Sequence, residues 1–325
     1  MRVGIVGAGT MGEVHAAAWR ATNAELAGCI AAHPNQTETL ARRYDLRVYS
    51  DYAELLGNVE IADICTPTPL HKAMVLQAAK AGKHVICEKP IALTVEDAQT
   101  MIQACAEAGV RFFVGMVLRF FPQYRLAKEL VAKRQIGELS VLRLKRVAYM
   151  PQKSPSNWYL DEMRSGGMVV DLMIHDFDYA RWLAGEVERV YAKRNRASRG
   201  PEEYVQAVLR FTNGAMALVE GGWAYPPGVF RTAIDLSGTD GLIEWSSDQP
   251  APVHTFSSAK PGEGASVGLP LAGLSEDPYA AEIRHAWNAI TSGSRFEVTP
   301  EDALESLRIA LAARESLATG NPVYL

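Results

Sequence analysis

The chain has 325 residues, of which 48% are apolar and 22% are charged, and its formal net charge is −4 at pH 7. These proportions are close to the globular average and exclude disordered, collagen-like and disulfide-scaffold proteins. The balanced charge argues against a non-specific binder of nucleic acid or anionic membranes, which needs a basic surface. The length predicts two domains of roughly 100–200 residues each, and no apolar run reaches the ~18 residues of a membrane span.

The N-terminus and the cysteines predict a cytoplasmic protein. Met1 and Arg2 lead directly into the apolar run Val3–Val6, which leaves no room for a secretory signal. The four cysteines are spaced by 36, 22 and 18 residues, and they are Cys29, Cys65, Cys87 and Cys105. This spacing matches no paired-cysteine metal or redox motif. We therefore interpret them as reduced core side chains and expect no metal.

Strand and helix patterns alternate through the first 115 residues. Apolar runs typical of buried strands lie at Val3–Val6, Leu26–Ala31, Ile61–Cys65, Val85–Cys87 and Phe112–Val114. Helical patterns lie between them at Met11–Arg20, Gln36–Tyr44, Leu70–Lys80 and Thr94–Ala108. Continuous apolar strands separated by helices indicate a parallel sheet covered on both faces. The pattern predicts a doubly wound α/β domain over residues 1–120.

After residue 120 the pattern becomes rich in strands. We expect strands at Val141–Tyr149, Glu188–Lys193, Tyr204–Phe211, Ala215–Trp223, Thr232–Ser237 and Leu242–Trp245. Asn213-Gly214 is typical of a hairpin turn. Residues 246–277 are rich in Gly, Pro and Ser and predict a loop, and helices at 278–291 and 299–319 close the chain. Residues 121–325 are therefore predicted to form an α+β domain with a mainly antiparallel open sheet.

A glycine-rich segment follows the first strand and opens the first helix. It reads Gly7-Ala8-Gly9-Thr10-Met11-Gly12, a G-x-G-x-x-G pattern. In this context the first glycine makes the turn, the second lets the backbone approach a pyrophosphate, and the third lets the helix pack on the sheet. The segment predicts a dinucleotide-binding Rossmann loop that uses Gly7, Gly9, Thr10, Met11 and Gly12. The alternative is an ordinary tight turn.

The end of the second strand bears on the choice of dinucleotide. An acidic residue at this position usually holds the adenosine ribose of NAD. Here the segment Ile30–His33 contains no Asp or Glu, so we assign Ala31 and His33 to the cofactor site. His33, Arg42 and Arg43 could attract a 2′-phosphate, although the arginines could equally form a solvated helix face. NAD and NADP both stay open, with a slight lean to NADP.

Two further segments carry candidate catalytic groups. Lys89, in Glu88-Lys89-Pro90, follows a strand at its carboxyl end, where ligands bind in open α/β sheets, although a surface loop lysine would fit as well. Asp171 and His175 are four residues apart and would share one face of a helix. The carboxylate could orient the imidazole or pair with a lysine of the other domain. A core histidine or a metal pair are the alternatives, and no third metal-ligand motif accompanies them.

Together these segments resemble the Gfo/Idh/MocA family of oxidoreductases over essentially the whole chain. The segments that carry the resemblance are Gly7–His15, Asp63–Pro67, His71, Gly82–Pro90, Arg119–Pro122, Gly166–Asp171 with His175, Gly238–Gly241, and Asp277–Tyr279 with Glu282. The resemblance implies an N-terminal Rossmann domain, a C-terminal open sheet that often mediates oligomers, and catalysis by Lys89, Asp171 and His175. The sequence departs from the family at Ala31, where NAD-using members commonly have Asp.

The resemblance also suggests roles for individual side chains. His175 would be the acid/base, since the free pKa of histidine, ~6.5, is near operating pH. Lys89 would stabilise the reacting oxygen or itself carry the proton, and Asp171 would orient one of the two. Residues expected beside the nicotinamide half of the cofactor are Thr66, Pro67, His71, Glu88 and Lys89. Residues considered for the substrate wall are Arg119, Trp158 and Tyr159, with packing between the domains as their alternative.

The sequence thus predicts an NAD(P)-dependent oxidoreductase. It would transfer a hydride between nicotinamide and a secondary alcohol or ketone of a sugar, sugar derivative or cyclitol, a substrate class that comes from the family resemblance. A glycosidase-like or eliminating enzyme that retains and recycles NAD is one alternative, and a non-catalytic dinucleotide sensor is another. The expected partners are the small-molecule substrate and further copies of the chain, as a homodimer or homotetramer.

Overall fold

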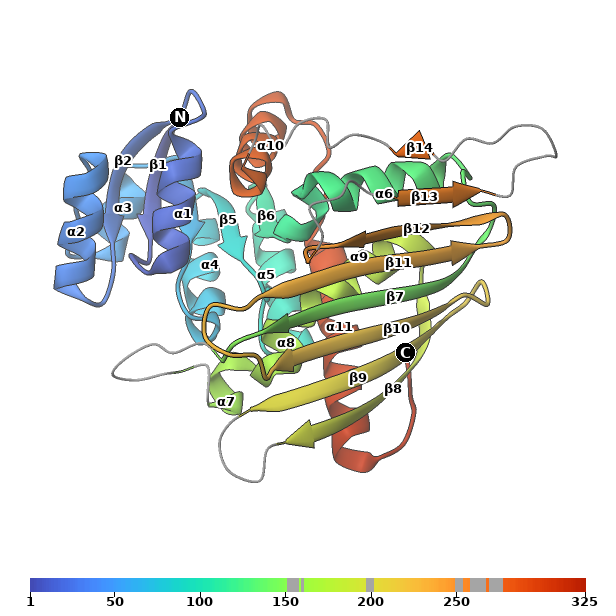
Figure 1. Cartoon of the computed structure of the whole chain (residues 1–325). Helices are drawn as coiled ribbons and strands as arrows, with labels where there is room; N and C mark the ends of the chain where they lie inside the picture. Colours follow the sequence, from blue (N-terminus) through green and yellow to red (C-terminus); the bar gives the residue numbers. More distant parts are fainter. Residues whose placement is uncertain (151–157, 159–160, 197–201, 249–253, 258–266, 269–276) are drawn as a thin grey trace. The chain divides into compact units, whose positions relative to one another are not determined.

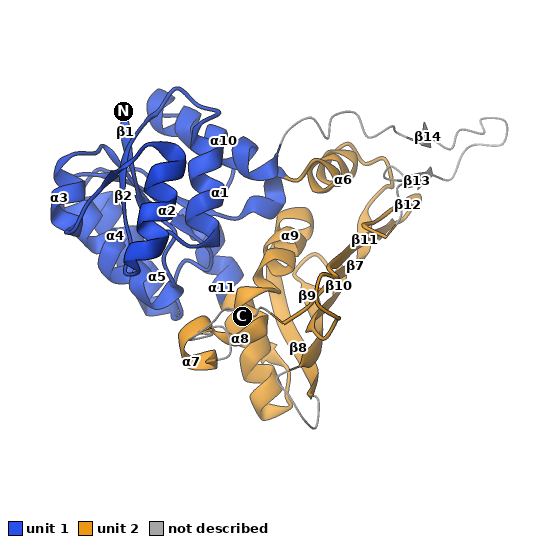
Figure 2. Ribbon diagram, turned by 60° about the vertical axis from the view of Figure 1, so that its left-hand side comes forward, with its two compact units in different colours: residues 1–120, 275–307 blue, residues 121–274, 308–325 orange. Residues whose placement is uncertain are grey.

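The computed structural model of the chain describes residues 1–150, 158, 161–196, 202–248, 254–257, 267–268 and 277–325. They form two compact units, which Figure 2 distinguishes by colour. The first unit comprises residues 1–120 with 275–307, and the second comprises 121–274 with 308–325. The sequence analysis also divided the chain after residue 120. It assigned 275–307 to the second domain, whereas the structure packs these residues with the first unit.

The first unit contains a six-stranded sheet (Figure 1). Its strands are β1 (Arg2–Val6), β2 (Glu25–Ile30), β3 (Arg47–Val48), β4 (Ile61–Ile64), β5 (His84–Glu88) and β6 (Phe112–Gly115). They lie in the order β3-β2-β1-β4-β5-β6, and every pair is parallel. The predicted doubly wound parallel sheet is therefore confirmed. The strand order reverses beside β1, and ligands bind at such a point in open α/β sheets.

The helical elements of the first unit connect these strands. They are α1 (Thr10–Trp19), α2 (Pro34–Tyr44), α3 (Tyr52–Gly57), η1 (Thr68–Leu70), α4 (His71–Lys80), α5 (Val95–Glu107), η2 (Val117–Phe120) and α10 (Pro278–Ser292). Thr94 caps α5, since the Asp97 N–H donates to the Thr94 hydroxyl over 3.1 Å, so the helix begins where the sequence pattern placed its start. The sequence analysis missed β3 and α3, which are too short to show a period. Helix α10 packs on α1, where Trp287 meets Trp19 edge to face.

The second unit contains a nine-stranded sheet. Its strands are β7 (Leu139–Ala148), β8 (Val187–Arg196), β9 (Glu203–Phe211), β10 (Met216–Trp223), β11 (Arg231–Gly238), β12 (Gly241–Ser246), β13 (His254–Ser257), β14 (Val267–Gly268) and β15 (Val323–Tyr324). Their order is β14-β13-β12-β11-β7-β10-β9-β8-β15, and only β7 and β10 pair in parallel among these described strands. The prediction of a mainly antiparallel sheet is confirmed. The hairpin turn between β9 and β10 forms as expected, with Gly214 at φ +91°.

The prediction of a continuous loop over residues 246–277 was wrong, because β13 and β14 lie within it. They have four and two residues, which is too short to show the alternating pattern of a strand. The helices of the second unit are α6 (Pro122–Ala132), α7 (Glu162–Ser165), α8 (Gly167–Asp171), α9 (Ile174–Ala184) and the part of α11 (Pro300–Thr319) from residue 308. Helices α8 and α9 contact one face of the sheet (Figure 2).

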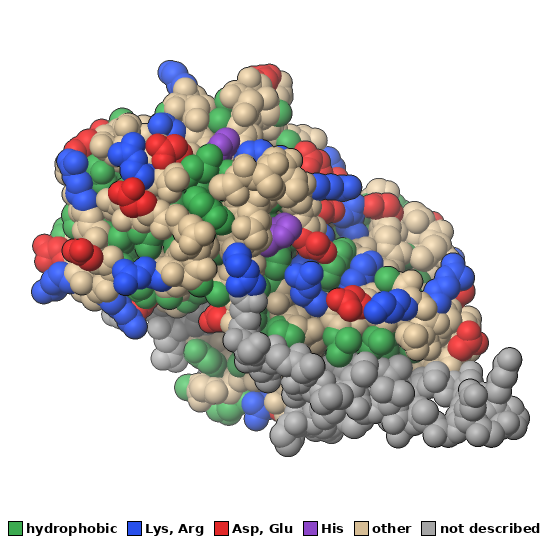
Figure 3. Space-filling view, turned by 90° about the horizontal axis from the view of Figure 1, so that it is seen from above, with side chains coloured by type: hydrophobic (Ala, Val, Ile, Leu, Met, Phe, Trp, Pro, Cys, Tyr) green, Lys and Arg blue, Asp and Glu red, His purple; other side chains and the backbone are tan. Residues whose placement is uncertain are grey.

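Two general properties of the surface bear on function. On the face drawn in Figure 3, the cationic and anionic side chains of the described residues are interspersed, in agreement with the balanced composition. In the part of the chain that the structure describes, no helix is both long and apolar enough to cross a bilayer.

Candidate active site

The glycine-rich loop has the geometry that a dinucleotide requires. Gly7 has φ +110°, a conformation that favours glycine, and a Cβ on Gly12 would collide with the Gly7 carbonyl oxygen. A Cβ on Gly9, by contrast, would meet no atom within 4 Å, so this residue borders open space. The loop ends at the N-terminus of α1, whose first residue is Thr10. The backbone thus leaves room for a pyrophosphate opposite a helix N-terminus.

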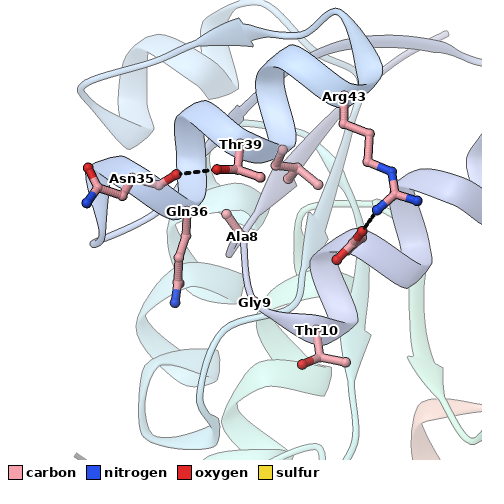
Figure 4. Close-up of a pocket in the computed structure, with 9 residues that line it drawn as sticks. Ala8, Gly9, Thr10, Asn35, Gln36, Thr39 and Arg43 are labelled. Atoms are coloured by element: carbon pink, nitrogen blue, oxygen red, sulfur yellow. Dashed lines mark hydrogen bonds and ion pairs between the residues drawn. The ribbon is translucent and has the colours of Figure 1, made fainter. Parts of the chain in front are cut away.

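A hollow of about 370 Å³ adjoins this loop (Figure 4). The loop and α1 form one side and α2 the other, and the lining residues are Ala8, Gly9, Thr10, Glu13, Asn35, Gln36, Thr39, Leu40 and Arg43. The hollow lies beyond the carboxyl end of β2, where a Rossmann domain receives the adenosine ribose. The residues present therefore fit the adenosine half of a dinucleotide.

The charges in this hollow differ from the sequence expectation. Arg43, considered for a 2′-phosphate, is paired with the Glu13 carboxylate of α1 (Figure 4). Arg42 turns to its own helix, where Nε donates to the Glu38 carbonyl over 3.3 Å. His33 is exposed and precedes α2. The one carboxylate and the one guanidinium lining the described hollow therefore balance each other.

Thr66, Pro67 and His71 lie around the carboxyl end of β4. The His71 ring is fully buried, with Nε2 2.9 Å from the Thr66 carbonyl oxygen and Nδ1 3.0 Å from that of Pro90. Burial lowers the pKa of His71, so its ring is neutral and donates from one nitrogen. His71 thus ties the loop after β4 to the loop after β5. Thr66 and Pro67 are half-buried and stay candidates for contact with the cofactor.

Lys89 directly follows β5, and its side chain is half-buried. The peptide bond between Lys89 and Pro90 is cis. Glu88, the last residue of β5, is 6% exposed, and its Oε2 accepts the Lys89 N–H over 3.0 Å. The predicted position of Lys89 at a carboxyl end of the parallel sheet is therefore what the structure shows.

A buried acid–base network lies behind Glu88. His15, on α1, places Nε2 2.9 Å from Glu88 Oε1 and Nδ1 3.0 Å from both oxygens of Asp63, in β4. The Trp19 indole donates to Asp63 Oδ2 over 2.7 Å, and the Cys65 thiol lies 3.6 Å from Oδ1. Burial alone would lower the pKa of His15, but the Asp63 carboxylate raises it well above the ordinary value. The ring is therefore an imidazolium between two carboxylates.

The same network contains atoms that could ligate a metal, since those of His15, Asp63 and Cys65 lie within 4.8 Å of one another. Two observations favour the hydrogen-bonded state. Burial raises the pKa of the Cys65 thiol to about 12, which keeps it protonated and a poor ligand. Both ring nitrogens of His15 already face carboxylates, so neither offers a lone pair.

Glu282 brings a further carboxyl group to this network from α10. It is 1% exposed, and neither of its oxygens has a hydrogen-bond partner. Burial, and after it the Glu88 carboxylate, raises the pKa of Glu282 well above its usual range. Burial without a hydrogen-bond partner therefore favours the neutral carboxylic acid over the carboxylate.

The sequence analysis predicted that Asp171 and His175 share one face of a single helix, but in the second unit they lie on two different helices. Asp171 ends α8, and His175 lies in the first turn of α9. Leu172 and Met173 join the helices in helical conformation, and the Met173 N–H bonds to the Met168 carbonyl, five residues back. This wider turn interrupts the expected i, i+4 geometry. Asp171 is 9% exposed and His175 is half-buried.

The three substrate-wall candidates have different outcomes. Arg119 is 2% exposed, and its Nη1 lies 3.0 Å from the Glu297 carbonyl and 3.4 Å from Asp302, all within the first unit. These contacts pack Arg119 within the first unit, not between the domains, and its contact with substrate stays a prediction. Trp158 is half-buried and precedes α7, where its carbonyl accepts the Asp161 N–H, so its contact with substrate stays a prediction. Tyr159 lies outside the described residues.

Sequence reasoning did not assign His15, Asp63 or Glu282 to the site, although each leaves a signal. Asp63 stands within the apolar strand Ile61–Cys65, and a carboxylate in a buried strand requires a partner. His15 is on the buried face of α1, three residues after Gly12 and four before Trp19. These signals indicate a buried charge, but the partner that balances it lies far along the chain.

The comparisons with known proteins decide the family. Residues 1–116 match the model of the oxidoreductase family with an NAD-binding Rossmann fold, and residues 124–244 match the GFO/IDH/MocA C-terminal domain. The 1,5-anhydro-D-fructose reductase of Ensifer adhaerens is 30% identical over 98% of this chain and 97% of its own length. The chain belongs to the Gfo/Idh/MocA family of oxidoreductases.

Two other known proteins are similar to this chain over its full length. The myo-inositol 2-dehydrogenase of Thermotoga maritima is 29% identical over 100% of this chain and 98% of its own. The solved structure of levoglucosan dehydrogenase, in complex with NADH and levoglucosan, has a TM-score of 0.88 at 25% identity and covers 100% of this chain and 99% of that one. The predicted family and the class of NAD-binding oxidoreductase are thereby confirmed.

Proposed function

We propose that this family member oxidises a secondary alcohol of a sugar, sugar derivative or cyclitol, or reduces the corresponding ketone. The observation that carries the proposal is Lys89, which follows β5 at the ligand-binding edge of the parallel sheet and whose backbone is held by a buried carboxylate. Relatives named for inositol, an anhydro sugar and levoglucosan support the substrate class.

In this proposal Lys89 and His175 divide the chemistry. A bound nicotinamide supplies the acceptor or donor of the hydride. As the carbon–hydrogen bond breaks, the hydroxyl proton must leave, and His175 accepts it as general base. Lys89 donates a hydrogen bond to the same oxygen and stabilises its developing negative charge. Asp171 orients one of the two groups.

We infer that NAD is the better fitting cofactor. Glu13 balances the charge of Arg43, which the sequence analysis considered for a 2′-phosphate. A phosphate entering the hollow would have to displace this carboxylate or stand beside it. A ribose with two free hydroxyls carries no such cost. The neutral side chains of Asn35, Gln36 and Thr39 supply hydrogen-bonding groups for it.

The test uses the full chain with NAD and a panel of inositols, anhydro sugars and ketoses, followed by nicotinamide absorbance. Lys89→Met and His175→Asn are each expected to lower kcat by about 10²-fold or more, since removed donors and general bases typically cost this much. Lys80→Met, in the last turn of α4, is the matched control and should retain wild-type turnover. Wild-type kcat in both site variants would refute the assignment.

The same assay separates the two alternatives. Cleavage of a glycoside without net formation of NADH would select the enzyme that recycles a retained dinucleotide. Dinucleotide binding without turnover of any panel member would select the sensor. The sensor gives no reason for a lysine at the strand edge whose backbone N–H is held by a buried carboxylate, so we favour the oxidoreductase.

We further propose that the chain forms a homodimer or homotetramer through the face of the nine-stranded sheet opposite α8 and α9. Met216 and Leu218, on alternate positions of β10, are 39% and 38% exposed. Exposed apolar side chains in a regular row favour burial against a second copy. Leu218→Lys is expected to shift the mass measured by light scattering toward the monomer, and an unchanged mass would exclude this face.

The cysteines are the support for a cytoplasmic location, which we also propose. All four are free, and burial raises the pKa of Cys29 to about 11 and that of Cys105 to about 12. Such thiols stay protonated and persist in a reducing compartment. Cell fractionation tests this, and recovery of the protein outside the cytoplasm would contradict it.

A further inference from the structure

A series of buried hydrogen bonds ends at the backbone N–H of Lys89, whose side-chain amine is the candidate catalytic group. It runs from the Trp19 indole to Asp63, from Asp63 to His15, and from His15 to Glu88, over distances of 2.7, 3.0 and 2.9 Å. The last bond is the 3.0 Å contact between Glu88 Oε2 and the Lys89 N–H. The groups come from α1, β4 and β5, so three elements of the first unit meet behind one peptide.

The two oxygens of Glu88 have different tasks. Oε1 accepts from the imidazolium of His15, and Oε2 accepts from the Lys89 backbone. Glu88 is only 6% exposed, and burying a carboxylate costs free energy unless an opposite charge pairs with it. His15 supplies this opposite charge. The position of the Lys89 peptide is therefore set through a charge-assisted bond rather than by the loop alone.

The neighbouring strand leaves space for this arrangement. Glu88 pairs in register with Gly115 of β6, and a Cβ on Gly115 would stand 3.4 Å from Glu88 Oε1. That separation is at the limit of close contact, so the carboxylate occupies the space beside a residue without a side chain. Glu88 Oε1 thus lies close both to His15 and to Gly115 of β6.

We propose that Glu88 is a positioning residue for Lys89, held in place by the buried imidazole of His15. The inference rests on the proposed function, because it assumes that the amine of Lys89 acts on substrate. A displacement of about 1 Å at a reacting group can cost about 10²-fold in rate. Loss of the Glu88 carboxylate should therefore reduce kcat without removing any group that contacts the substrate.

The experiment compares Glu88→Ala with Glu88→Gln in the full chain with NAD. The alanine variant loses the acceptor for the Lys89 N–H, and kcat is expected to fall 10- to 100-fold. In the glutamine variant the amide oxygen still accepts this N–H while its NH₂ group donates to a neutral His15. We expect kcat within about threefold of wild type there, a rescue that a charge-only role would not give.

A double-mutant cycle with Lys89→Met identifies the route of the effect. If Glu88 acts through the amine, Glu88→Ala should change the residual rate less than about twofold in the Lys89→Met background, measured in single turnovers at high enzyme concentration. An equal loss in both backgrounds would overturn the inference and leave the proposed function standing. Wild-type turnover in Lys89→Met alone would overturn both, so the two failures are distinguishable.

His15→Gln provides a second variant that lies away from Lys89. It removes the cation that holds Glu88 while leaving Glu88 and Lys89 in place. We expect the same loss of kcat with unchanged NAD affinity, and again little effect in the Lys89→Met background. This variant also covers the case in which Glu88→Ala fails to fold. A His15→Gln enzyme with wild-type kcat would contradict the proposed network.

Discussion

Each compact unit contains a buried network of charged side chains, and the two networks use different chemistry. In the first unit, the imidazolium of His15 lies between two carboxylates, next to the unpartnered acid of Glu282. In the second unit, the Arg146 guanidinium makes a two-point contact with Asp176, with Nε–Oδ2 at 2.7 Å and Nη2–Oδ1 at 3.2 Å. The side chains of Arg146 and Asp176 are both almost fully buried.

The difference lies in which groups can change charge. Burial alone would lower the pKa of Arg146, but the Asp176 carboxylate raises it above its ordinary value, so the guanidinium is charged at every pH of interest. Burial lowers the pKa of His15 but the Asp63 carboxylate raises it well above its ordinary value, and burial raises that of Glu282, so the charge of each group depends on its neighbours. The buried pair of Arg146 and Asp176 thus has a structural role in the second unit. In the first unit, the buried charge of His15 is connected through Glu88 to the backbone N–H of Lys89, the candidate catalytic residue.

The largest effect on stability should come from the second network. Asp176→Ala leaves Arg146 buried without its partner, and breaking such a pair typically costs about 3–5 kcal/mol of unfolding free energy. Burial raises the pKa of Asp176, but the charge of Arg146 opposes this rise. Because the guanidinium does not titrate between pH 6 and pH 9 and holds Asp176 ionised, the loss should be equal at the two pH values. Urea unfolding followed by tryptophan fluorescence measures it.

The matched control for this variant is Asp235→Ala. Asp235 pairs with Arg143 over 3.0 Å, and their side chains are 36% and 50% exposed, so the loss should stay below about 1 kcal/mol. Equal losses in the two variants would show that burial does not distinguish these ion pairs. A loss at Asp176 that varies between pH 6 and pH 9 would contradict the comparison of the two networks.

A smaller, pH-dependent effect should come from Glu282→Gln. A carboxyl group whose folded pKa exceeds the unfolded value, about 4.3, binds its proton more tightly in the native state, so its contribution to stability falls as pH rises above that value. Glutamine cannot ionise. The unfolding free energy of the variant relative to wild type should therefore rise by about 1.4 kcal/mol per pH unit above pH ~4.3, until the folded pKa is reached.

Thermal and urea unfolding between pH 5 and pH 8 checks this prediction, with Glu38→Gln on the exposed face of α2 as control. The groups that face Glu282 are Glu88, His15 and Asp63, and none of them changes in the variant. A difference that stays flat over this range would show that Glu282 is ionised in the folded protein.

The smallest effect on stability should come from the exposed ion pair of Arg43 and Glu13 at the adenosine hollow. This pair sharpens the comparison because its two charges are not buried. The side chains of Arg43 and Glu13 are 64% and 48% exposed. Glu13→Gln should leave stability within about 0.5 kcal/mol, since such pairs contribute little. It frees Arg43 for a 2′-phosphate, so kcat/KM for NADP should rise up to about fivefold relative to NAD. An unchanged ratio would exclude Arg43 as the determinant.

Local patterns predicted much of the first unit. Alternating apolar strands and amphipathic helices gave the parallel sheet, and the helical pattern that begins at Thr94 located the start of α5, where Thr94 is the N-cap. The same rules failed at Asp171 and His175, because a four-residue spacing implies a shared face only while the helix is continuous. The wider turn at Met173 depends on packing in the second unit, which a local pattern does not report.

The sequence by itself determined the glycine loop, the place of Lys89 after a buried strand and the family to which the chain belongs, because each depends on residues adjacent in the chain. Only the tertiary structure decided which charges are balanced. His15 meets partners 48 and 73 residues away, and α10 returns from the far end of the chain to bring Glu282 to them. Such pairings depend on how the helices and strands pack in three dimensions. The spacing of residues along the chain does not show which distant side chains will meet.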